Sequence, residues 1–331
     1  MSDPLEKVSA APAPQWDDAA RVLTEAGEVA IACHVNPDGD AIGSVLAASL
    51  GLRKVGVATY PTWGSDPVRV PPSYAFLPGA DGLLQPSDVP PTDVFLALDC
   101  GAADRLGVLE ERARAATQLI NIDHHPGNEL FGTINIVVEN ASSTAELVAR
   151  VLRDVGVEFD RDIATCLYTG VVTDTGRFQY ASSTPDTLRL AADLLSFGVP
   201  AQEIAHEVFE SSPFGYLKLV GRVLDRAHLF EGERFVYSWI TLADLEETGV
   251  ALDETEKLID LVRSTRAADV AALFKEQPDG KYRVSLRSKG PRSVGAIARA
   301  RGGGGHELAA GFTADDVERA AERIRAELRS D

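Results

Sequence analysis

The sequence has few cysteines, no long apolar run and fewer basic than acidic residues. Its three cysteines, Cys33, Cys100 and Cys166, lack the paired spacing of a zinc site or a disulfide scaffold, so we expect reduced, buried thiols. Because no apolar run approaches the ~20 residues of a membrane span and no cleavable signal opens the chain, we expect a cytoplasmic protein that does not bind membranes. The net charge of −18 argues against a general DNA-binding surface, which would be basic.

The chain has the length and the apolar content for two domains. We expect a disordered tail over residues 1–15, a first domain over 16–198, a helical linker over 199–222 and a smaller second domain over 223–331. Strand and helix patterns occur in both domains. The expected fold class is therefore α/β, in two lobes.

Apolar runs in the first domain predict strands that alternate with helices, which is typical of a mostly parallel sheet flanked by helices. The expected strands cover residues 28–33, 57–61, 93–99, 118–123 and 132–138. The Pro- and Gly-rich passage 67–91 is expected to hold only a short helix and an edge strand, and 105–116 a surface helix. In the second domain, alternation over 228–240 and 270–286 predicts two hairpins.

The most informative stretch is His34-Val35-Asn36-Pro37-Asp38-Gly39-Asp40, which joins a predicted strand to a predicted helix. Such a loop lies at the carboxyl edge of an α/β sheet, where ligand crevices form. Pro37 and Gly39 permit a tight bend, so that the imidazole and both carboxylates can converge on a divalent cation. The alternative is that Asp38 and Asp40 only cap the helix, which such residues do more often than they bind metal.

Three further segments end in acidic or imidazole residues. The apolar runs 92–98 and 118–122 lead into Asp99 and into Asp123-His124-His125, and a helical segment leads into Asp174. Parallel strands aim their carboxyl ends at one edge, so these side chains are expected to meet the His34 loop.

Charge counting favours two cations over one. Four carboxylates would balance two divalent ions, with two histidines as neutral ligands: Asp38, Asp40, Asp99, Asp174, His34 and His124. Without cations, so many carboxylates would repel one another, and some would have to take up protons. Hard oxygen donors with a little imidazole favour Mn²⁺ or Mg²⁺, with Co²⁺ as a further candidate.

Two other features suggest anion binding, and each has a plainer explanation. Ser142 to Glu146 predicts a capped helix N-terminus, which can hold phosphate but is more often simply a cap. Between Lys281 and Arg301 there are seven basic residues and no acidic one, followed by the glycine run 302–305. The alternatives are a solvated charged face and a flexible linker, although the position inside a folded lobe favours nucleotide contact.

These residues resemble the motifs of the DHH phosphoesterase superfamily. The resemblance rests on His34-Val-Asn-Pro-Asp38-Gly-Asp40, Leu-Asp99-Cys-Gly, Asp123-His124-His125 and Thr173-Asp174-Thr-Gly. Downstream, Ser285-Leu-Arg-Ser-Lys and Gly302-Gly-Gly-Gly-His306-Glu-Leu-Ala-Ala-Gly311-Phe resemble the DHHA1 domain of nanoRNase-type members, so that the match spans roughly residues 15 to 330. The resemblance implies a catalytic DHH domain, a nucleotide-binding DHHA1 domain, an active site in the cleft between them, and homodimers.

The resemblance also implies an activity and residue roles. The activity is two-metal hydrolysis of very short oligoribonucleotides or dinucleotides, of 3'-phosphoadenosine 5'-phosphate, or of cyclic or linear di-adenylate. His34, Asp38 and Asp99 would hold one ion; Asp40, Asp99, His124 and Asp174 would hold the other. His125 would contact the phosphate and protonate the leaving oxygen, while Asn36 and Asp123 orient ligands. The nucleotide would contact Arg287, Ser288, Gly303, Gly304, Gly305 and His306, with Arg266 as a weaker candidate.

One departure and three rival interpretations accompany this assignment. Arg292-Ser293-Val294 stands where an Asp-Val pair is common, which puts recognition of a terminal phosphate in doubt. A pyrophosphatase of the same superfamily would share the metal motifs, but it carries a different second domain. A nucleotide-binding regulatory module without turnover, or a metal-stabilised structural protein, would not need an intact ligand set.

Overall fold

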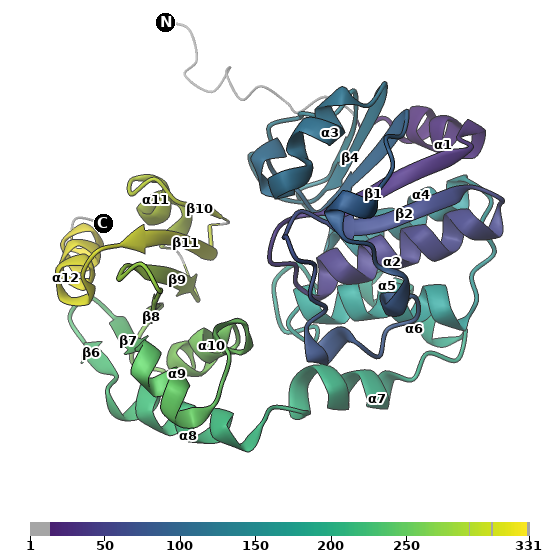
Figure 1. Cartoon of the computed structure of the whole chain (residues 1–331). Helices are drawn as coiled ribbons and strands as arrows, with labels where there is room; N and C mark the ends of the chain where they lie inside the picture. The colour runs from purple at the N-terminus through teal and green to yellow at the C-terminus, as the bar shows by residue number, and fades with distance from the viewer. Residues whose placement is uncertain (1–13, 291, 306, 330–331) are drawn as a thin grey trace, which may run out of the picture. The chain divides into compact units, whose positions relative to one another are not determined.

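The computed structural model describes residues 14–290, 292–305 and 307–329. The chain divides between Glu210 and Ser211 into two compact units, purple to teal and green to yellow in Figure 1. This division falls inside the stretch 199–222 that was expected to link two domains. Most of the expected tail lies outside the described residues, and the first helix, α1, is Trp16–Glu25.

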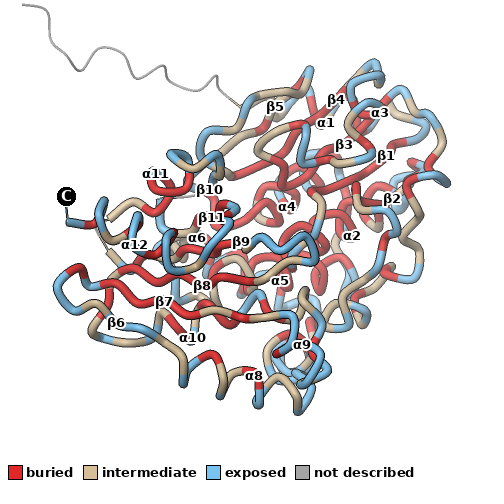
Figure 2. The backbone as a smooth tube through the Cα atoms, turned by 60° about the vertical axis from the view of Figure 1, so that its left-hand side comes forward, coloured by how far each residue is buried: buried red, intermediate tan, exposed pale blue. Residues whose placement is uncertain are grey.

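The first unit is built on a five-stranded sheet with the order β2-β1-β3-β4-β5, in which every neighbouring pair is parallel. The strands are β1 Glu28–Cys33, β2 Ala58–Trp63, β3 Val94–Leu98, β4 Gln118–Asp123 and β5 Ile134–Val137. Figure 2 shows that β1, β3 and β4 are buried along most of their length. Strands buried on both faces read as continuous apolar runs, which explains why the sequence predicted them. The α/β fold class is confirmed.

Helices cover both faces of this sheet. One core contains residues from α1, α2 Gly39–Lys54, α4 Thr144–Asp154 and α5 Arg161–Asp174, with α6 Pro185–Leu195 packed on α5. The other face is covered by the 3₁₀ segment η4 Ala103–Leu109 and by α3 Glu110–Ala115. In β1, Ile31 and Cys33 face the first core, whereas Ala30 and Ala32 face the second.

Two local expectations were wrong. Residues 67–91 hold three 3₁₀ turns, η1 Pro72–Tyr74, η2 Ala80–Gly82 and η3 Pro86–Asp88, and no edge strand. Repeated prolines explain this, because each one removes a donor that a strand would need. The helix expected over 105–116 breaks at Gly107 (φ 55°), where a Cβ would lie 2.5 Å from the Gly64 carbonyl oxygen.

The second unit is a six-stranded sheet with the order β10-β11-β9-β8-β7-β6, antiparallel except between β7 and β8. Its strands are β6 His228–Phe230, β7 Phe235–Ile240, β8 Val270–Glu276, β9 Tyr282–Ser288, β10 Gly304–Gly305 and β11 Ala309–Ala314. Both predicted hairpins, β6–β7 and β8–β9, are present. One face packs on α8 Phe214–Asp225, α9 Leu242–Thr248 and α10 Leu258–Arg263; the other packs on α11 Val294–Arg299 and α12 Val317–Leu328.

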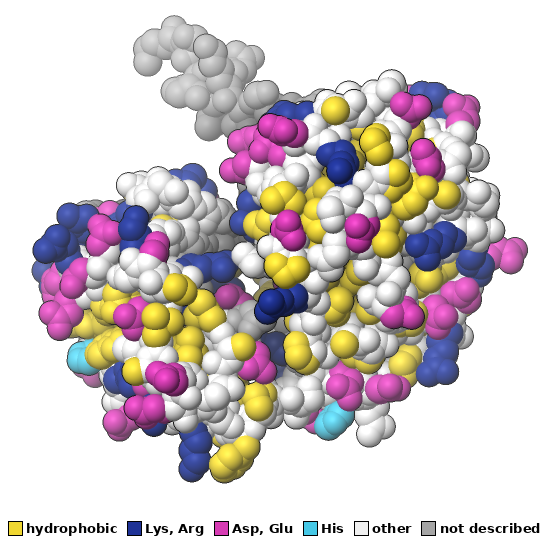
Figure 3. Space-filling view, viewed as in Figure 1, with side chains coloured by type: hydrophobic (Ala, Val, Ile, Leu, Met, Phe, Trp, Pro, Cys, Tyr) yellow, Lys and Arg dark blue, Asp and Glu magenta, His cyan; other side chains and the backbone are white. Residues whose placement is uncertain are grey.

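Surface charge is mixed on the face of the molecule shown in Figure 3, where acidic and basic side chains are interspersed. Among the described residues, no helix has both the length and the apolar character needed to cross a bilayer.

Close packing of α2 on α5 connects the core to the sheet edge. A Cβ at Gly43 would lie 2.5 Å from the Cys166 carbonyl oxygen, and one at Gly170 would lie 2.8 Å from Asp40 Oδ1. These glycines let the two helices approach, so that the first turn of α2 lies near the last residue of α5, Asp174.

We expect Gly43→Ala to destabilise the protein by about 1–3 kcal/mol, because the added methyl group must displace α5. In an unconstrained helix the same change would stabilise by roughly 1 kcal/mol, so the sign of the effect tests the packing. Denaturant unfolding followed by circular dichroism measures it. Gly221→Ala is the matched control, since this glycine lies inside helix α8 and a Cβ there meets nothing within 4 Å. A stabilised Gly43→Ala variant would contradict the close approach.

Candidate metal centre

Acidic and imidazole side chains lie at one edge of the first sheet, at the ends of three parallel strands and of two helices. His34 follows β1, Asp99 follows β3, and His124 follows β4. Asp40 lies in the first turn of α2, and Asp174 is the last residue of α5. Segments that are far apart in the sequence therefore meet because neighbouring parallel strands end on the same side.

Three groups of side chains bring ligand atoms within 4.8 Å of one another. They are His34, Asp38 and Asp99; Asp40, His124 and Asp174; and Asp99, His124 and His125. The first two groups together contain all six side chains expected as ligands, and the third joins them through Asp99 and His124. Carboxylate oxygens with imidazole nitrogens form a donor set that fits hard or borderline divalent cations.

Asp99 lies at the centre of the cluster. It is 3% exposed and has φ 58°, a backbone conformation that is uncommon for a residue with a side chain. Its Oδ1 accepts a hydrogen bond from the Thr144 hydroxyl at 2.9 Å, and its Oδ2 lies 3.4 Å from His34 Nε2. Burial alone would raise the pKa of Asp99, but the hydrogen bond from His34 and the neighbouring imidazoles outweigh it and hold that pKa well below its usual range.

Asp40 is held by the N-terminus of α4. Its Oδ2 accepts from the Thr144 amide at 2.6 Å, and its Oδ1 accepts from the Ala145 amide at 2.9 Å. The helix end that the sequence suggested for phosphate thus binds a carboxylate of the same chain, through free amides and the helix dipole. Ser143 caps α4 as expected, and Glu146 bonds to Ser142.

The carboxylates of the cluster lie so close together that, without cations, they cannot all stay ionised. Burial, followed by the charges of Asp99 and Asp174, raises the pKa of Asp40 well above its ordinary value. Burial raises the pKa of Asp174 to about 7, with His124 opposing the shift and Asp38 adding to it. In the absence of cations, protons must take their place, which is the behaviour expected of a metal centre.

Both candidate histidine ligands present Nε2 to the carboxylates. The Nδ1 of His34 lies 2.9 Å from the Val35 carbonyl oxygen, which can only accept, so Nδ1 carries a proton. Without a cation, Nε2 is also protonated and donates to Asp99, and a bound cation would replace that proton. The Nδ1 of His124 lies 3.3 Å from the Ala141 carbonyl oxygen. Its Nε2 lies 3.5 Å from Asp174 Oδ2 and 3.7 Å from Asp99 Oδ1. This tautomer is the one that binds a metal through Nε2.

His125 is held in a different way. Its Nδ1 lies 2.7 Å from Oδ1 of the fully buried Asp123, whose Oδ2 accepts from Asn128 at 2.6 Å. Burial would lower the pKa of His125, but the hydrogen bond to Asp123 and the charge of Asp99 prevail and raise it to about 10. His125 is therefore a protonated acid at neutral pH, beside the carboxylate cluster and one-third exposed.

The two interpretations of Asp38 are compatible. One of its oxygens, Oδ1, accepts from the amides of Asp40 and Ala41, each at 3.1 Å, so Asp38 does cap α2. Capping engages one carboxylate oxygen, and Asp38 still belongs to the group with His34 and Asp99. Asn36 has φ 54°, and its amide donates to the Ser65 hydroxyl at 3.3 Å.

The residues expected to bind nucleotide lie in the second unit, on separate elements. Arg287 and Ser288 end β9, Gly304–Gly305 is β10, and Arg266 is an exposed loop residue; His306 lies outside the described residues. A Cβ at Gly303 would lie 2.1 Å from the Gly311 carbonyl oxygen, so the close approach to β11 requires a glycine there. A Cβ at Gly304 would meet nothing within 4 Å.

Sequence reasoning missed several partners of the cluster. Thr144 bonds both Asp99 and Asp40, Asn128 holds Asp123, and the Arg105 guanidinium lies 3.4 Å from His34 Nδ1. The capping signal did locate the end of α4, but nothing local indicated which carboxylate it would meet. Cys33 and Cys100 adjoin the cluster as free, fully buried thiols, and burial raises the pKa of each well above its ordinary value.

Comparison with known proteins places these motifs in a family. Residues 28–171 match the DHH family, N-terminal domain, and residues 232–330 match the DHHA1 domain. The chain is 35% identical over 330 residues to the bifunctional oligoribonuclease and PAP phosphatase NrnA of Thermus thermophilus, covering 97% of each chain. It is 30% identical over 300 residues to the Bacillus subtilis protein of the same name, covering 89% of this chain and 91% of that relative.

Solved structures show the same fold. An exopolyphosphatase-related protein from Bacteroides fragilis superposes with a TM-score of 0.86 at 26% identity, covering 95% of this chain and 97% of that one. RecJ of Thermus thermophilus, in complex with Mn²⁺, gives a TM-score of 0.61 at 15% identity. It covers 97% of this chain and 55% of RecJ, and this likeness concerns the fold alone.

The pKa of Asp174 predicts how pH affects the metal-free protein. Its folded value of about 7 exceeds the unfolded value of about 3.9, so its contribution to stability is complete below the unfolded value and is lost as pH rises toward 7. Cation binding needs the ionised carboxylate, so we expect the thermal shift produced by Mn²⁺ to grow over the same window.

Thermal unfolding with EDTA and with Mn²⁺, between about pH 5 and 7.5, measures both trends. Asp174→Asn is the control, because it removes the titrating group and should flatten them. A metal-free melting temperature that rises across this window would contradict the assignment.

Proposed function

The chain belongs to the DHH family, with a DHH domain followed by a DHHA1 domain, and on this premise we propose that it degrades very short oligoribonucleotides to mononucleotides in a metal-dependent reaction. The relatives that align along nearly its whole length are bifunctional oligoribonucleases and PAP phosphatases, and this chain is likewise a hydrolase of phosphoesters. The observation that carries the proposal is that Asp99 belongs both to the group with His34 and Asp38 and to the group with His124 and His125, so that carboxylates and histidines meet at one place.

Six side chains are proposed to hold two divalent cations. One ion is assigned to His34, Asp38 and Asp99, and the other to Asp40, Asp99, His124 and Asp174. Asp99 suits a bridging role because its two oxygens face different groups. The oxygen-rich donor set favours Mn²⁺, with Mg²⁺ and Co²⁺ as alternatives. When bound, the cations would lower the pKa of an attacking water and neutralise charge on the phosphate.

His125 is proposed to donate a proton to the leaving oxygen. Asp123 fixes the ring by holding Nδ1, and Nε2 is the proposed proton donor. Asn128 in turn holds Asp123, which keeps its carboxylate oriented toward the imidazole. The hydrogen bond to Asp123 favours the charged imidazole, so this arrangement gives a positioned acid.

The second unit is proposed to bind the nucleotide. Arg287, Ser288 and the glycines Gly303 to Gly305, with His306 and Arg266, are the residues that the family resemblance assigns to this role. Arginine can hold a phosphate with two hydrogen bonds, and glycines without Cβ allow backbone amides to approach it. The strongly acidic remainder of the chain is consistent with a short substrate rather than a long polyanion. A homodimer is the proposed assembly.

Initial rates on a substrate panel test the proposal. Purified protein with Mn²⁺ should release mononucleotides from dinucleotides, and the panel extends to 3'-phosphoadenosine 5'-phosphate, cyclic di-adenylate and its linear form. Inorganic diphosphate is the control, because its turnover alone would favour the pyrophosphatase alternative. Binding without turnover of any member would favour a regulatory module.

Loss of either carboxylate should abolish hydrolysis without unfolding the protein. We expect Asp99→Ala and Asp174→Ala to lower kcat by more than about 10³-fold, since each removes a ligand of the proposed cations. Circular dichroism should show unchanged secondary structure. Asp17→Ala, an exposed acid on α1, is the control. Full activity in either ligand variant would reject the two-cation assignment.

Changes at His125 should separate proton transfer from metal binding. We expect His125→Ala to lower kcat by about 10²–10⁴-fold, with Mn²⁺ affinity changed far less. Asp123→Asn should shift the basic limb of the pH–kcat profile to lower pH, because the carboxylate that raises the pKa of His125 is gone. His228→Ala, an exposed histidine of the second unit, should behave like the parent. An unshifted limb would remove His125 from the acid role.

A further inference from the structure

A buried ammonium group in the second unit lies at a position that would suit an apolar side chain. Lys275, on β8, is 1% exposed, and its neighbours on the same face of the strand, Ala271 and Leu273, belong to the core that packs on α10. Its Nζ donates a hydrogen bond to Glu256 Oε1 at 2.6 Å. Because a buried charge is costly unless an opposite charge meets it, the Lys275 ammonium requires an anion beside it.

Two arginines share this face of the sheet with Lys275. Alternate residues of β9 lie in the core that packs on α11 and α12, so Arg283, Ser285 and Arg287 lie on the opposite face. Arg283 is the direct cross-strand neighbour of Lys275. Burial would raise the pKa of Glu256, but Lys275 and the charges of both arginines prevail and hold that pKa below its usual range. The three cations therefore act on one carboxylate.

The cations on this face outnumber the acids that bind them. Lys275 is paired with Glu256, but among the described residues neither Arg283 nor Arg287 forms an ion pair. The Arg287 guanidinium donates to the neighbouring Leu286 carbonyl oxygen at 3.0 Å. In a chain with a net charge of −18, cations without acids beside them favour an anionic ligand.

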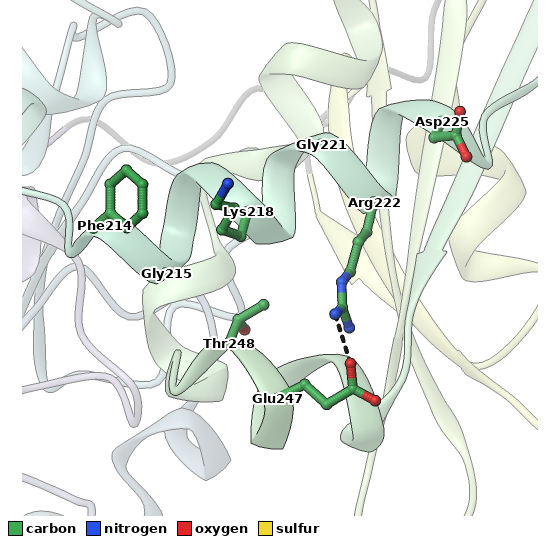
Figure 4. A pocket seen from close by; sticks show the side chains of 8 residues that line it. All are labelled: Phe214, Gly215, Lys218, Gly221, Arg222, Asp225, Glu247 and Thr248. Atoms are coloured by element: carbon green, nitrogen blue, oxygen red, sulfur yellow. Dashed lines mark hydrogen bonds and ion pairs between the residues drawn. The ribbon is translucent and has the colours of Figure 1, made fainter.

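Another cluster of charges in the second unit shows what a purely structural tie looks like. Arg222, on α8, forms an ion pair with Glu247, on α9 (Figure 4). Arg226 donates to both carboxylate oxygens of Asp244. Each of these arginines has an acid of its own, so the cluster joins two helices and is balanced in charge. The excess of cations on β8 and β9 is therefore not needed for such a tie.

A polar side chain without a partner lies between the two arginines. Ser285 is 9% exposed, and its hydroxyl forms no hydrogen bond within the part of the chain that the structure describes. Its neighbour across the strand pair with β11 is Gly311, which has no side chain to cover it. Each arginine lies two residues from Ser285 along β9, roughly 7 Å. Because buried polar groups are normally hydrogen-bonded, this hydroxyl favours a polar ligand at the same place.

We propose that Lys275, Arg283 and Ser285 form a phosphate-binding site at which the Glu256 carboxylate competes with the phosphate group of a nucleotide or with free inorganic phosphate. A phosphate group accepts hydrogen bonds from ammonium, guanidinium and hydroxyl donors, and it carries the negative charge that this face lacks. Glu256 is 53% exposed and precedes α10, so it can turn to solvent when a phosphate group displaces it. The inference rests on the proposed nucleotide-binding role of the second unit, to which it adds an anion site beside Arg287.

Calorimetric titration in the presence of EDTA tests the site apart from hydrolysis. The ligands are inorganic phosphate and adenosine 5'-monophosphate, with adenosine as the uncharged control. Lys275→Met keeps an apolar stem without the charge, so we expect it to weaken phosphate binding by at least about tenfold. Arg319→Met, which removes an exposed cation of α12 on the other side of the sheet, should bind like the parent.

The two ligands distinguish the source of the phosphate group. Weaker binding of both ligands by Lys275→Met assigns the site to nucleotide phosphate, and weaker binding of inorganic phosphate alone assigns it to the free anion. Unchanged binding of both by Lys275→Met, or no binding of either by the parent, would overturn the proposal. Hydrolysis does not enter this measurement, so an inactive protein with an intact phosphate site would refute only the catalytic proposal.

Glu256→Gln separates competition from a plain ion pair. The variant leaves the Lys275 ammonium buried without an anion, so it should melt below the parent in phosphate-free buffer. Phosphate then meets no competing carboxylate, so it should bind at least about threefold more tightly and raise the melting temperature further than in the parent. Glu231→Gln, an exposed acid of the β6–β7 hairpin, is the control. Phosphate affinity equal to that of the parent would overturn the competition.

Discussion

Four carboxylates gather at one sheet edge, two of them, Asp40 and Asp99, buried, and this is the constraint on which the first unit depends. Like charges in a low-dielectric site repel strongly, so each must be matched by a proton, a cation or a donor. The chain itself supplies some of these donors. Two backbone amides of α4 donate hydrogen bonds to Asp40, and the Thr144 hydroxyl donates one to Asp99. The remaining negative charge is what a divalent cation would neutralise, and this links the stability of the fold to its chemistry.

The scaffold holds this charge because its elements cannot easily move apart. Parallel register fixes β1, β3 and β4 side by side, and their carboxyl ends carry His34, Asp99 and His124. Contacts of α2 with α5 through Gly43 and Gly170 set the separation of Asp40 from Asp174. The core thus determines the spacing of the ligands, and the second unit has its own sheet and core.

Much of the first unit could be predicted, for reasons visible in particular residues. Buried strands read as apolar runs, and the polar residues at their ends identified the six side chains that the structure brings together. Long-range contacts could not be predicted in this way. Nothing near Thr144 points to Asp99, 45 residues away, and the break at Gly107 depends on a carbonyl group of a distant loop.

The two thiols beside the carboxylate cluster affect how this part of the protein reacts with metal ions and oxidants. Cys33 and Cys100 are wholly enclosed, and burial keeps both protonated at physiological pH. A protonated thiol is a poor nucleophile and a poor ligand for thiophilic metals such as cadmium or mercury. Two sulfur atoms therefore lie beside the carboxylate cluster without offering a thiolate to peroxide or to a soft metal ion.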